Sequence, residues 1–229
     1  GTSDILLQDA SGTIVNWSMK NGVCSGGSAV GNASGWTVVG TGDFNGDGTS
    51  DILFQNGTGS VVEWTMNSGM CTGGKVVGGA AGWAIVGSDD FNGDGTSDIL
   101  LQNAAGVIVD WTMKNGDYSS GYVVGTASGW TVVGTGDFNG DGTGDILLRN
   151  SAGTIVDWLM NDRGEISATN NLGTNPGWSV ASIGDYNNDG TADILLTNNV
   201  GTVVDWTMNN GLVVNGSVIG NTVGFNIQS

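Results

Sequence analysis

The sequence predicts an all-β protein, a five-bladed β-propeller made of four-stranded repeats of about 47 residues. Three observations predict this fold class: an acidic phrase recurs at a fixed period, each period holds four short β-type segments, and Gly is abundant (43 of 229 residues) while Pro occurs once. The last acids of the phrase, Asp51, Asp98, Asp145 and Asp193, are 47, 47 and 48 residues apart. A period in this range indicates a solenoid, a propeller or another array, because one such unit is too small to bury a core alone.

The first segment of the repeat reads Gly-Trp-Thr-Val-Val-Gly, as at residues 35–40 and 129–134. Its β-branched residues between two glycines favour a short strand. The aromatic residue of this segment recurs as Trp36, Trp83, Trp130, Trp178 and Phe225.

The acidic phrase follows, and after it come three more segments with the pattern of strands. The second reads Asp-Ile-Leu-Leu-Gln, as at residues 98–102, and a Gly-containing turn leads to the third, as at residues 108–113. In the third segment Val109, Trp111 and Met113 alternate with polar residues, which a strand turns to opposite faces. A further turn, Asn-Gly in several copies, leads to a weaker fourth segment such as 122–125. No helical period of 3.6 is present, and four strands per repeat in radial repetition describe a propeller blade.

The chain ends fit a ring. Gly1 aligns with Gly48, and Ser229 aligns with Gly40, so the N-terminus supplies strands two to four of a blade and the C-terminus supplies its first strand. We therefore expect residues 1–229 to form a single propeller domain, closed by pairing of the N- and C-terminal segments, which removes open sheet edges. The alternative is a fragment of a larger propeller or array.

Composition limits the partners. The formal net charge is −17, from 22 acidic and 5 basic residues, which disfavours nucleic acid and anionic membranes. No transmembrane run or signal peptide is present, and we expect a mature or trimmed product because the chain starts within a repeat. Cys24 and Cys71 occupy equivalent positions in neighbouring repeats, and we expect two separate thiols.

The acidic phrase, Asp-x-Asn-x-Asp-Gly-x-x-Asp, predicts a calcium loop. Oxygen donors at positions 1, 3, 5 and 9 and Gly at position 6 suit Ca²⁺, and position 7 can offer its main-chain carbonyl. Position 12 is Phe or Leu and strands flank the loop, so an EF-hand is excluded. A turn without metal is the alternative interpretation, but three like charges would then crowd each loop.

The phrase occurs intact four times, and we expect about four Ca²⁺ ions. The first repeat keeps only Asp4 and is expected to hold no ion. The expected ligands are Asp43, Asn45, Asp47, Thr49 and Asp51; Asp90, Asn92, Asp94, Thr96 and Asp98; Asp137, Asn139, Asp141, Thr143 and Asp145; Asp185, Asn187, Asp189, Thr191 and Asp193.

Two further rows of residues recur in the third segment. Large aromatic residues at one position can fill the space between blades, or they can serve as sugar-stacking platforms of a multivalent lectin. Polar residues beside them can form a solvated or turn-bonded face, or they can accept sugar hydroxyls. The first row is Trp17, Trp64, Trp111, Trp158 and Trp206, and the second is Asn16, Glu63, Asp110, Asp157 and Asp205.

Catalysis is poorly supported. The chain has no His, which excludes Ser-His and Cys-His nucleophile systems and His-ligated zinc. Paired carboxylates can hydrolyse glycosides, but an active site needs unlike residues converging once, whereas these acids recur symmetrically. We therefore predict that the protein is not an enzyme, with a glycoside hydrolase as the least favoured alternative.

The stretch Gly-Asp-Phe-Asn-Gly-Asp-Gly-Thr-Ser-Asp-Ile-Leu at residues 42–53 resembles the FG-GAP/VCBS-type repeats of integrin-like β-propellers, found in bacterial secreted proteins and some fungal lectins. The resemblance covers essentially the whole chain, although about five repeats stand where seven are common. It implies that the loop joins the inner strand to the second strand of a blade, that metals stiffen the blades, and that ligands bind between blades or on a propeller face.

These expectations combine into one functional hypothesis. We expect a secreted, extracellular, calcium-stabilised β-propeller that acts as a multivalent carbohydrate-binding, lectin-like module. The alternative is a structural or protein-adhesion domain of a larger secreted protein, so the expected partners are glycans or a protein surface.

Overall fold

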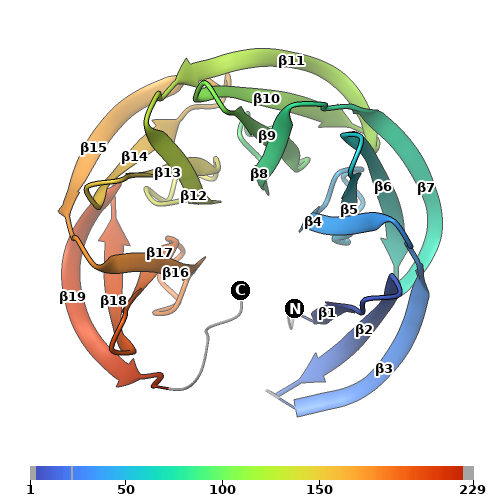
Figure 1. The fold of residues 1–229 in the computed structure, drawn as a ribbon, viewed down its shortest axis with the longest axis horizontal. Coiled ribbons are helices and arrows are strands. Elements are labelled where there is room, and N and C mark those ends of the chain that lie inside the picture. The colour runs from blue at the N-terminus through green and yellow to red at the C-terminus, as the bar shows by residue number, and fades with distance from the viewer. Residues whose placement is uncertain (1–3, 22, 224–229) are drawn as a thin grey trace.

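The computed structural model describes residues 4–21 and 23–223, and these form a five-bladed β-propeller (Figure 1). Five antiparallel sheets stand around a central axis, which confirms the predicted all-β fold class. Among the described residues there is no helix, and hence none that could cross a membrane.

The strands follow the predicted order of four segments per repeat. Blade 1 has, among the described residues, β1 (Ile5–Gln8), β2 (Thr13–Lys20) and β3 (Val23–Asn32). Blade 2 has β4 (Trp36–Gly42), β5 (Asp51–Asn56), β6 (Ser60–Asn67) and β7 (Met70–Gly79). Blade 3 has β8 (Trp83–Asp89), β9 (Asp98–Asn103), β10 (Val107–Lys114) and β11 (Asp117–Thr126). Blade 4 has β12 (Trp130–Gly136), β13 (Asp145–Asn150), β14 (Thr154–Met160) and β15 (Ile166–Thr174). Blade 5 has β16 (Trp178–Gly184), β17 (Asp193–Asn198), β18 (Thr202–Asn209) and β19 (Leu212–Asn221).

Within each four-stranded blade the first strand lies nearest the centre and the fourth lies at the rim (Figure 1). Because successive strands are antiparallel, the loop after strand one and the turn after strand three lie on the same face of the ring. The predicted closing strand around Phe225 lies outside the described residues. Cys24 and Cys71 are free thiols.

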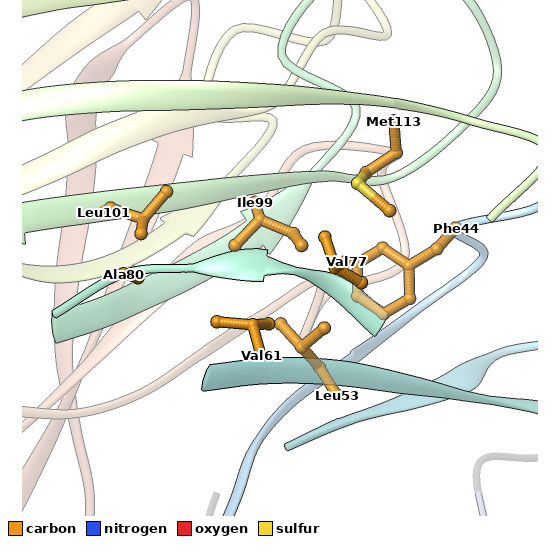
Figure 2. Close-up of a cluster of buried hydrophobic side chains, with 8 residues drawn as sticks. All are labelled: Phe44, Leu53, Val61, Val77, Ala80, Ile99, Leu101 and Met113. Carbon is orange, nitrogen blue, oxygen red and sulfur yellow. The ribbon is translucent and has the colours of Figure 1, made fainter. Parts of the chain in front are cut away.

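The core lies between blades, in four clusters of buried residues that each join two neighbouring sheets. Leu53 and Val61 of blade 2 meet Ile99, Leu101 and Met113 of blade 3 in one buried cluster (Figure 2). Similar clusters join blade 1 to 2, blade 3 to 4 and blade 4 to 5. The alternating pattern of the strands therefore supplies an apolar face to each adjacent blade.

Side chains of the second strand also hold the first strand of the following blade. Gln102 Nε2 donates a hydrogen bond to the Trp130 carbonyl (2.9 Å), and Val132 N donates to Gln102 Oε1 (3.1 Å). Gln8 makes the same pair of bonds to the first strand of blade 2, at 2.8 and 3.1 Å. The Trp of the first strand is half-buried, and its main-chain carbonyl accepts the hydrogen bond from the Gln side chain of the preceding blade.

Candidate functional site

The four acidic loops join the first strand to the second strand in blades 2 to 5. We call them loop 2 (residues 43–51), loop 3 (90–98), loop 4 (137–145) and loop 5 (185–193), and number each from 1 to 9. All four open onto one face of the ring, together with the turns that follow the third strands.

The chain in each loop wraps around the carboxylate at position 1. In loop 2, Asp43 Oδ1 accepts hydrogen bonds from the main-chain N–H groups of Gly46 (2.8 Å) and Asp47 (3.0 Å), and its Oδ2 accepts one from Gly48 (2.7 Å). Gly48 has a φ of +84°, a conformation that favours Gly at position 6. The position-1 acids of loops 3, 4 and 5 bond the equivalent Gly at 2.8, 2.8 and 3.0 Å.

The acid at position 9 is buried and ties the loop to the third strand. Asp51 Oδ1 accepts a hydrogen bond from Met66 N (2.8 Å), and its Oδ2 accepts one from Asn45 Nδ2 (3.0 Å). The equivalent bond to the third strand is 2.8 Å long in loops 3 and 4 and 2.9 Å in loop 5. Position 9 therefore fixes the end of each loop to the rest of its blade.

The ionised form of the buried position-9 carboxyl is disfavoured in loops 3 and 4. Burial, together with the nearby carboxylates of Asp110, Asp94 and Asp90, raises the pKa of Asp98 to about 8. Burial likewise raises the pKa of Asp145 to about 8. A cation held in the loop would oppose this effect, because an opposite charge nearby favours the ionised carboxylate.

Among residues 4–21 and 23–223, no three His, Cys, Asp or Glu side chains are gathered as a metal cage. Position-3 and position-5 oxygens instead accept main-chain N–H groups, as where Asp47 N donates to Asn45 Oδ1 (2.8 Å) and Thr49 N donates to Asp47 Oδ1 (2.9 Å). The donor set itself suits a hard cation, since each loop brings three carboxylates, one amide oxygen and a Thr carbonyl within nine residues. Calcium binding therefore stays a prediction, with ligands as expected from the sequence.

Neighbouring loops are joined by their main chains. Ser97 N, at position 8 of loop 3, donates a hydrogen bond to the Asp43 carbonyl at position 1 of loop 2 (2.8 Å). Gly144 N donates to the Asp90 carbonyl (2.8 Å), and Ala192 N donates to the Asp137 carbonyl (2.7 Å). No sequence pattern announced this contact, because it joins residues 54 or 55 positions apart.

A cavity lies at the interface of blades 1 and 2, where the described residues make no such bond. Its volume is ≈ 580 Å³, and it opens beside loop 2. Ser50, at position 8 of loop 2, is exposed and lines this cavity. The other lining residues are Asp4, Leu6, Asn16, Thr41, Gly48, Thr49, Asp51, Ile52, Met66 and Gly69. From the sequence, Asp4 is the one acid kept by the incomplete loop and Asn16 is a member of the polar row, but the pattern did not indicate that they share a cavity.

The Trp row packs against small residues of the preceding blade. A Cβ at Gly78 would lie only 3.2 Å from the Trp111 ring, and one at Gly125 only 2.9 Å from the Trp158 ring. Trp64 contacts Gly31 of blade 1 in the same way. These contacts are the ones expected if the Trp row fills the space between blades rather than stacking on sugars. Trp17, whose equivalents are half-buried, is 43% exposed.

The polar row is largely buried between blades. Glu63, Asp110 and Asp157 are fully buried, and both carboxylate oxygens of Glu63 lack a hydrogen-bond partner. Burial raises the pKa of Glu63 to about 7 and the pKa of Asp110 and of Asp157 to about 6. Asn16 is also buried, while Asp205 is half-buried.

Opposite this row, the fourth strand carries polar residues that reach the next blade. Asn170 Nδ2 donates a hydrogen bond to the Gly211 carbonyl in the turn of blade 5 (3.1 Å), and Lys75 Nζ donates to the Asn115 carbonyl in the turn of blade 3 (2.5 Å). The residues paired with the row are Ser28, Lys75, Tyr122, Asn170 and Ser217. The sequence pattern did not reveal them because the residue type varies between repeats (Ser, Lys, Tyr, Asn and Ser), although all five are polar.

Comparison with known proteins agrees with the fold. The family described as FG-GAP-like repeat matches residues 90–148 and 137–196. No curated protein matches the chain. Among solved structures, the Chaetomium thermophilum Raptor crystal structure is similar with a TM-score of 0.55 and 14% identity, over 95% of this chain and 20% of that chain. The RRP9 WD40 repeats are similar with a TM-score of 0.50 and 13% identity, over 98% of this chain and 64% of that chain. The chain thus spans less than two thirds of either structure, and likeness at this identity concerns the fold alone.

Proposed function

Because the chain is a five-bladed β-propeller that carries FG-GAP-like repeats, we propose that it is a secreted, calcium-stabilised module that binds carbohydrate. The observation that carries this proposal is the polar cavity between blades 1 and 2, which opens beside loop 2. We assign the sugar site to this cavity rather than to the Trp and polar rows, because most members of those rows are engaged between blades.

The cavity suits a small neutral saccharide in size and chemistry. Its volume of ≈ 580 Å³ lies in the usual range of small-molecule sites. Asp4, Thr41 and Ser50 offer a carboxylate and two hydroxyls to sugar hydroxyls, while Leu6 offers apolar contact. The buried Asn16 donates a hydrogen bond to Asp4 Oδ2 (3.1 Å). A net charge of −17 disfavours phosphorylated or otherwise anionic ligands.

Calcium is proposed to stiffen the face on which this cavity opens. The cation would offset the crowded carboxylates of each loop, and loop 2 contributes Gly48, Thr49, Ser50 and Asp51 to the cavity wall. Ordering of loop 2 would therefore also order one side of the sugar site. Binding without catalysis is proposed because the chain lacks His and its acids recur in every blade.

A glycan array of neutral saccharides, probed with and without about 1 mM Ca²⁺, tests this proposal. Ser50→Arg places a long side chain in the cavity and should abolish binding, while calcium removal should weaken it. Ser151→Arg is the matched control, since Ser151 is exposed in the turn between β13 and β14 on the opposite face. Absence of any bound saccharide, or equal binding by both variants, would contradict the proposal.

A protein-adhesion role is the second candidate, favoured by exposed apolar residues at equivalent positions of the rim. Val76, Val123 and Val218 are 76%, 61% and 70% exposed. Apolar side chains exposed in this way suit a protein partner better than a sugar. Under this alternative, the wild type would adhere to an extracellular protein, and replacing Val76, Val123 and Val218 by Ser would abolish that adhesion. Neither protein would bind a saccharide.

A further inference from the structure

The four loops form a continuous hydrogen-bonded series on one face. Each of loops 3, 4 and 5 donates its position-8 N–H to the position-1 carbonyl of the preceding loop, over 2.7–2.8 Å. At the first of these junctions the bond is doubled, because Asp43 N donates to Ser97 Oγ (3.0 Å). No loop in the series is therefore structurally independent of the next.

The methyl group of the Thr at position 7 also contacts the Gly at position 4 of the preceding loop. A Cβ at Gly46, position 4 of loop 2, would lie 3.1 Å from Thr96 Cγ2, at position 7 of loop 3. The same pair recurs as Gly93 with Thr143 (3.3 Å) and as Gly140 with Thr191 (3.2 Å). Position 7 of one loop thus packs on position 4 of its neighbour at all three junctions.

The contacting residues are the expected ligands or their direct neighbours. The carbonyl acceptor belongs to the Asp at position 1, whose carboxylate organises its own loop. The donor at position 8 stands between the Thr at position 7 and the buried Asp at position 9. An ordered loop therefore restrains the main chain at position 8 of the next loop, between the expected oxygen donors at positions 7 and 9.

We infer that the loops bind Ca²⁺ cooperatively, each loaded loop raising the affinity of its neighbours. This inference rests on the proposed calcium binding. Its physical basis is that a loop ordered by its neighbour has less conformational entropy left to lose when it binds its own ion. The coupling is reciprocal, so it acts in both directions along the series.

Charge acts in the opposite direction, because a loaded loop attracts the next Ca²⁺ less strongly than an empty loop does. Each loop carries three Asp residues, so one Ca²⁺ leaves a loaded loop with a net charge of −1 rather than −3. Loading one loop therefore weakens the attraction of its neighbours for Ca²⁺, but the loaded loop stays negative, so this opposing effect is smaller than that of an isolated cation. Repulsion between the ions themselves is further screened by salt beyond about 8 Å.

A calcium titration followed by native mass spectrometry tests the inference. Chains without ions and chains with four ions should dominate over the intermediates, with a Hill coefficient above 1. A statistical distribution of four ions with a Hill coefficient of 1 would overturn the inference and leave the proposed function standing. Absence of any bound Ca²⁺ would instead overturn the calcium proposal itself.

Ser97→Pro removes the N–H that joins loop 3 to loop 2. We expect it to weaken binding at loop 2 about 5-fold or more and to lower the Hill coefficient. Ser50→Pro is the matched control, because it makes the same change at position 8 of a loop that has no such bond to a preceding loop among the described residues. It should leave the cooperativity of calcium binding unchanged, and equal titrations of the two variants would overturn the inference.

Thr96→Ser provides a second variant that retains the main chain. It removes the Cγ2 that packs on Gly46 and keeps the hydroxyl that donates to the Met113 carbonyl (3.2 Å). Circular dichroism checks that each variant folds. Thr96→Ser should lower the Hill coefficient by less than Ser97→Pro does, and full cooperativity in both would overturn the inference.

Discussion

Asp157 is a buried carboxyl that has only part of its hydrogen-bonding capacity satisfied. Its side chain is fully buried on β14 and faces the interface with blade 5, where Oδ1 accepts a hydrogen bond from Asn170 N (3.1 Å) and Oδ2 has no partner. Burial is the largest cause that raises its pKa, to about 6, and the bonds to Asn170 act in the opposite direction. The folded protein therefore binds a proton at Asp157 more tightly than the unfolded chain does.

This difference predicts a pH dependence that Asp157→Asn should remove. A raised carboxyl pKa favours folding below the ordinary value of 3.8, and that stability is lost as the pH rises through about 6. The Asn variant does not titrate, so it should exceed the wild type in free energy of unfolding at pH 7 by on the order of 1 kcal/mol. Urea unfolding at pH 4 and at pH 7 measures this, and identical pH slopes in both proteins would count against it.

At the scale of the element, the acidic loop connects three parts of the molecule. Its position-9 acid bonds to the third strand, its position-1 carboxylate bonds to the loop's own main chain, and in loops 3 to 5 its position-8 N–H bonds to the preceding loop. The Phe44 carbonyl in loop 2 also accepts a hydrogen bond from Gly116 N in the turn of blade 3 (2.9 Å). A change of loop conformation should therefore be felt throughout the blade and in its neighbour.

Calcium removal should accordingly lower the melting temperature. A ligand that binds only the folded state stabilises it by mass action, by about 1.4 kcal/mol per site at roughly tenfold excess over Kd. Several loaded loops would then shift the Tm by about 10 °C or more for a chain of this size. Calorimetry with EDTA, then with Ca²⁺ restored, measures the shift, and Asp94→Asn should reduce it. An unchanged melting curve would mean that the loops carry no ion.

For the molecule as a whole, the interface between blades 5 and 1 differs from the others. Trp64, Trp111 and Trp158 each cover a Gly of the preceding blade, but Trp17 is 43% exposed. Gly220, on the fourth strand of blade 5, is equivalent to Gly78, and a Cβ there would meet nothing within 4 Å. Trp17 and Gly220 are thus the two halves of a contact that the repeat makes elsewhere.

If the ring closes at this interface in solution, Gly220→Val should destabilise the protein. The added side chain would occupy the place of the Trp17 ring, at a cost of about 1–3 kcal/mol in free energy of unfolding. Gly78→Val, under Trp111, should show the same loss, whereas Gly73→Val, which meets nothing within 4 Å, should be close to neutral. Urea unfolding of the three variants decides the matter, and a Gly220→Val variant as stable as Gly73→Val would indicate an open interface.

Much of this structure could be predicted from local pattern. Alternation in residues 109–113, glycines with positive φ such as Gly48 and Gly116, and the constant spacing of the loops specify strands, turns and blades. These features depend on residues close together in the chain, because strand periodicity and turn conformation are local properties. The acidic loops could be predicted for the same reason, because all the residues of each loop lie within nine consecutive positions.

What only the tertiary structure decided is which faces of the strands meet. The pattern left Trp111 open between packing and sugar stacking, and Gly78 of another blade decides that it is packed. Asp110 could equally have faced solvent, and blade 4 buries it; Ser50 could equally have joined a preceding loop, and it lines a cavity. The sequence by itself determined the repeat, the strands and the acidic loops, whereas burial and contact between blades depend on residues of successive repeats that the packing of adjacent blades brings together.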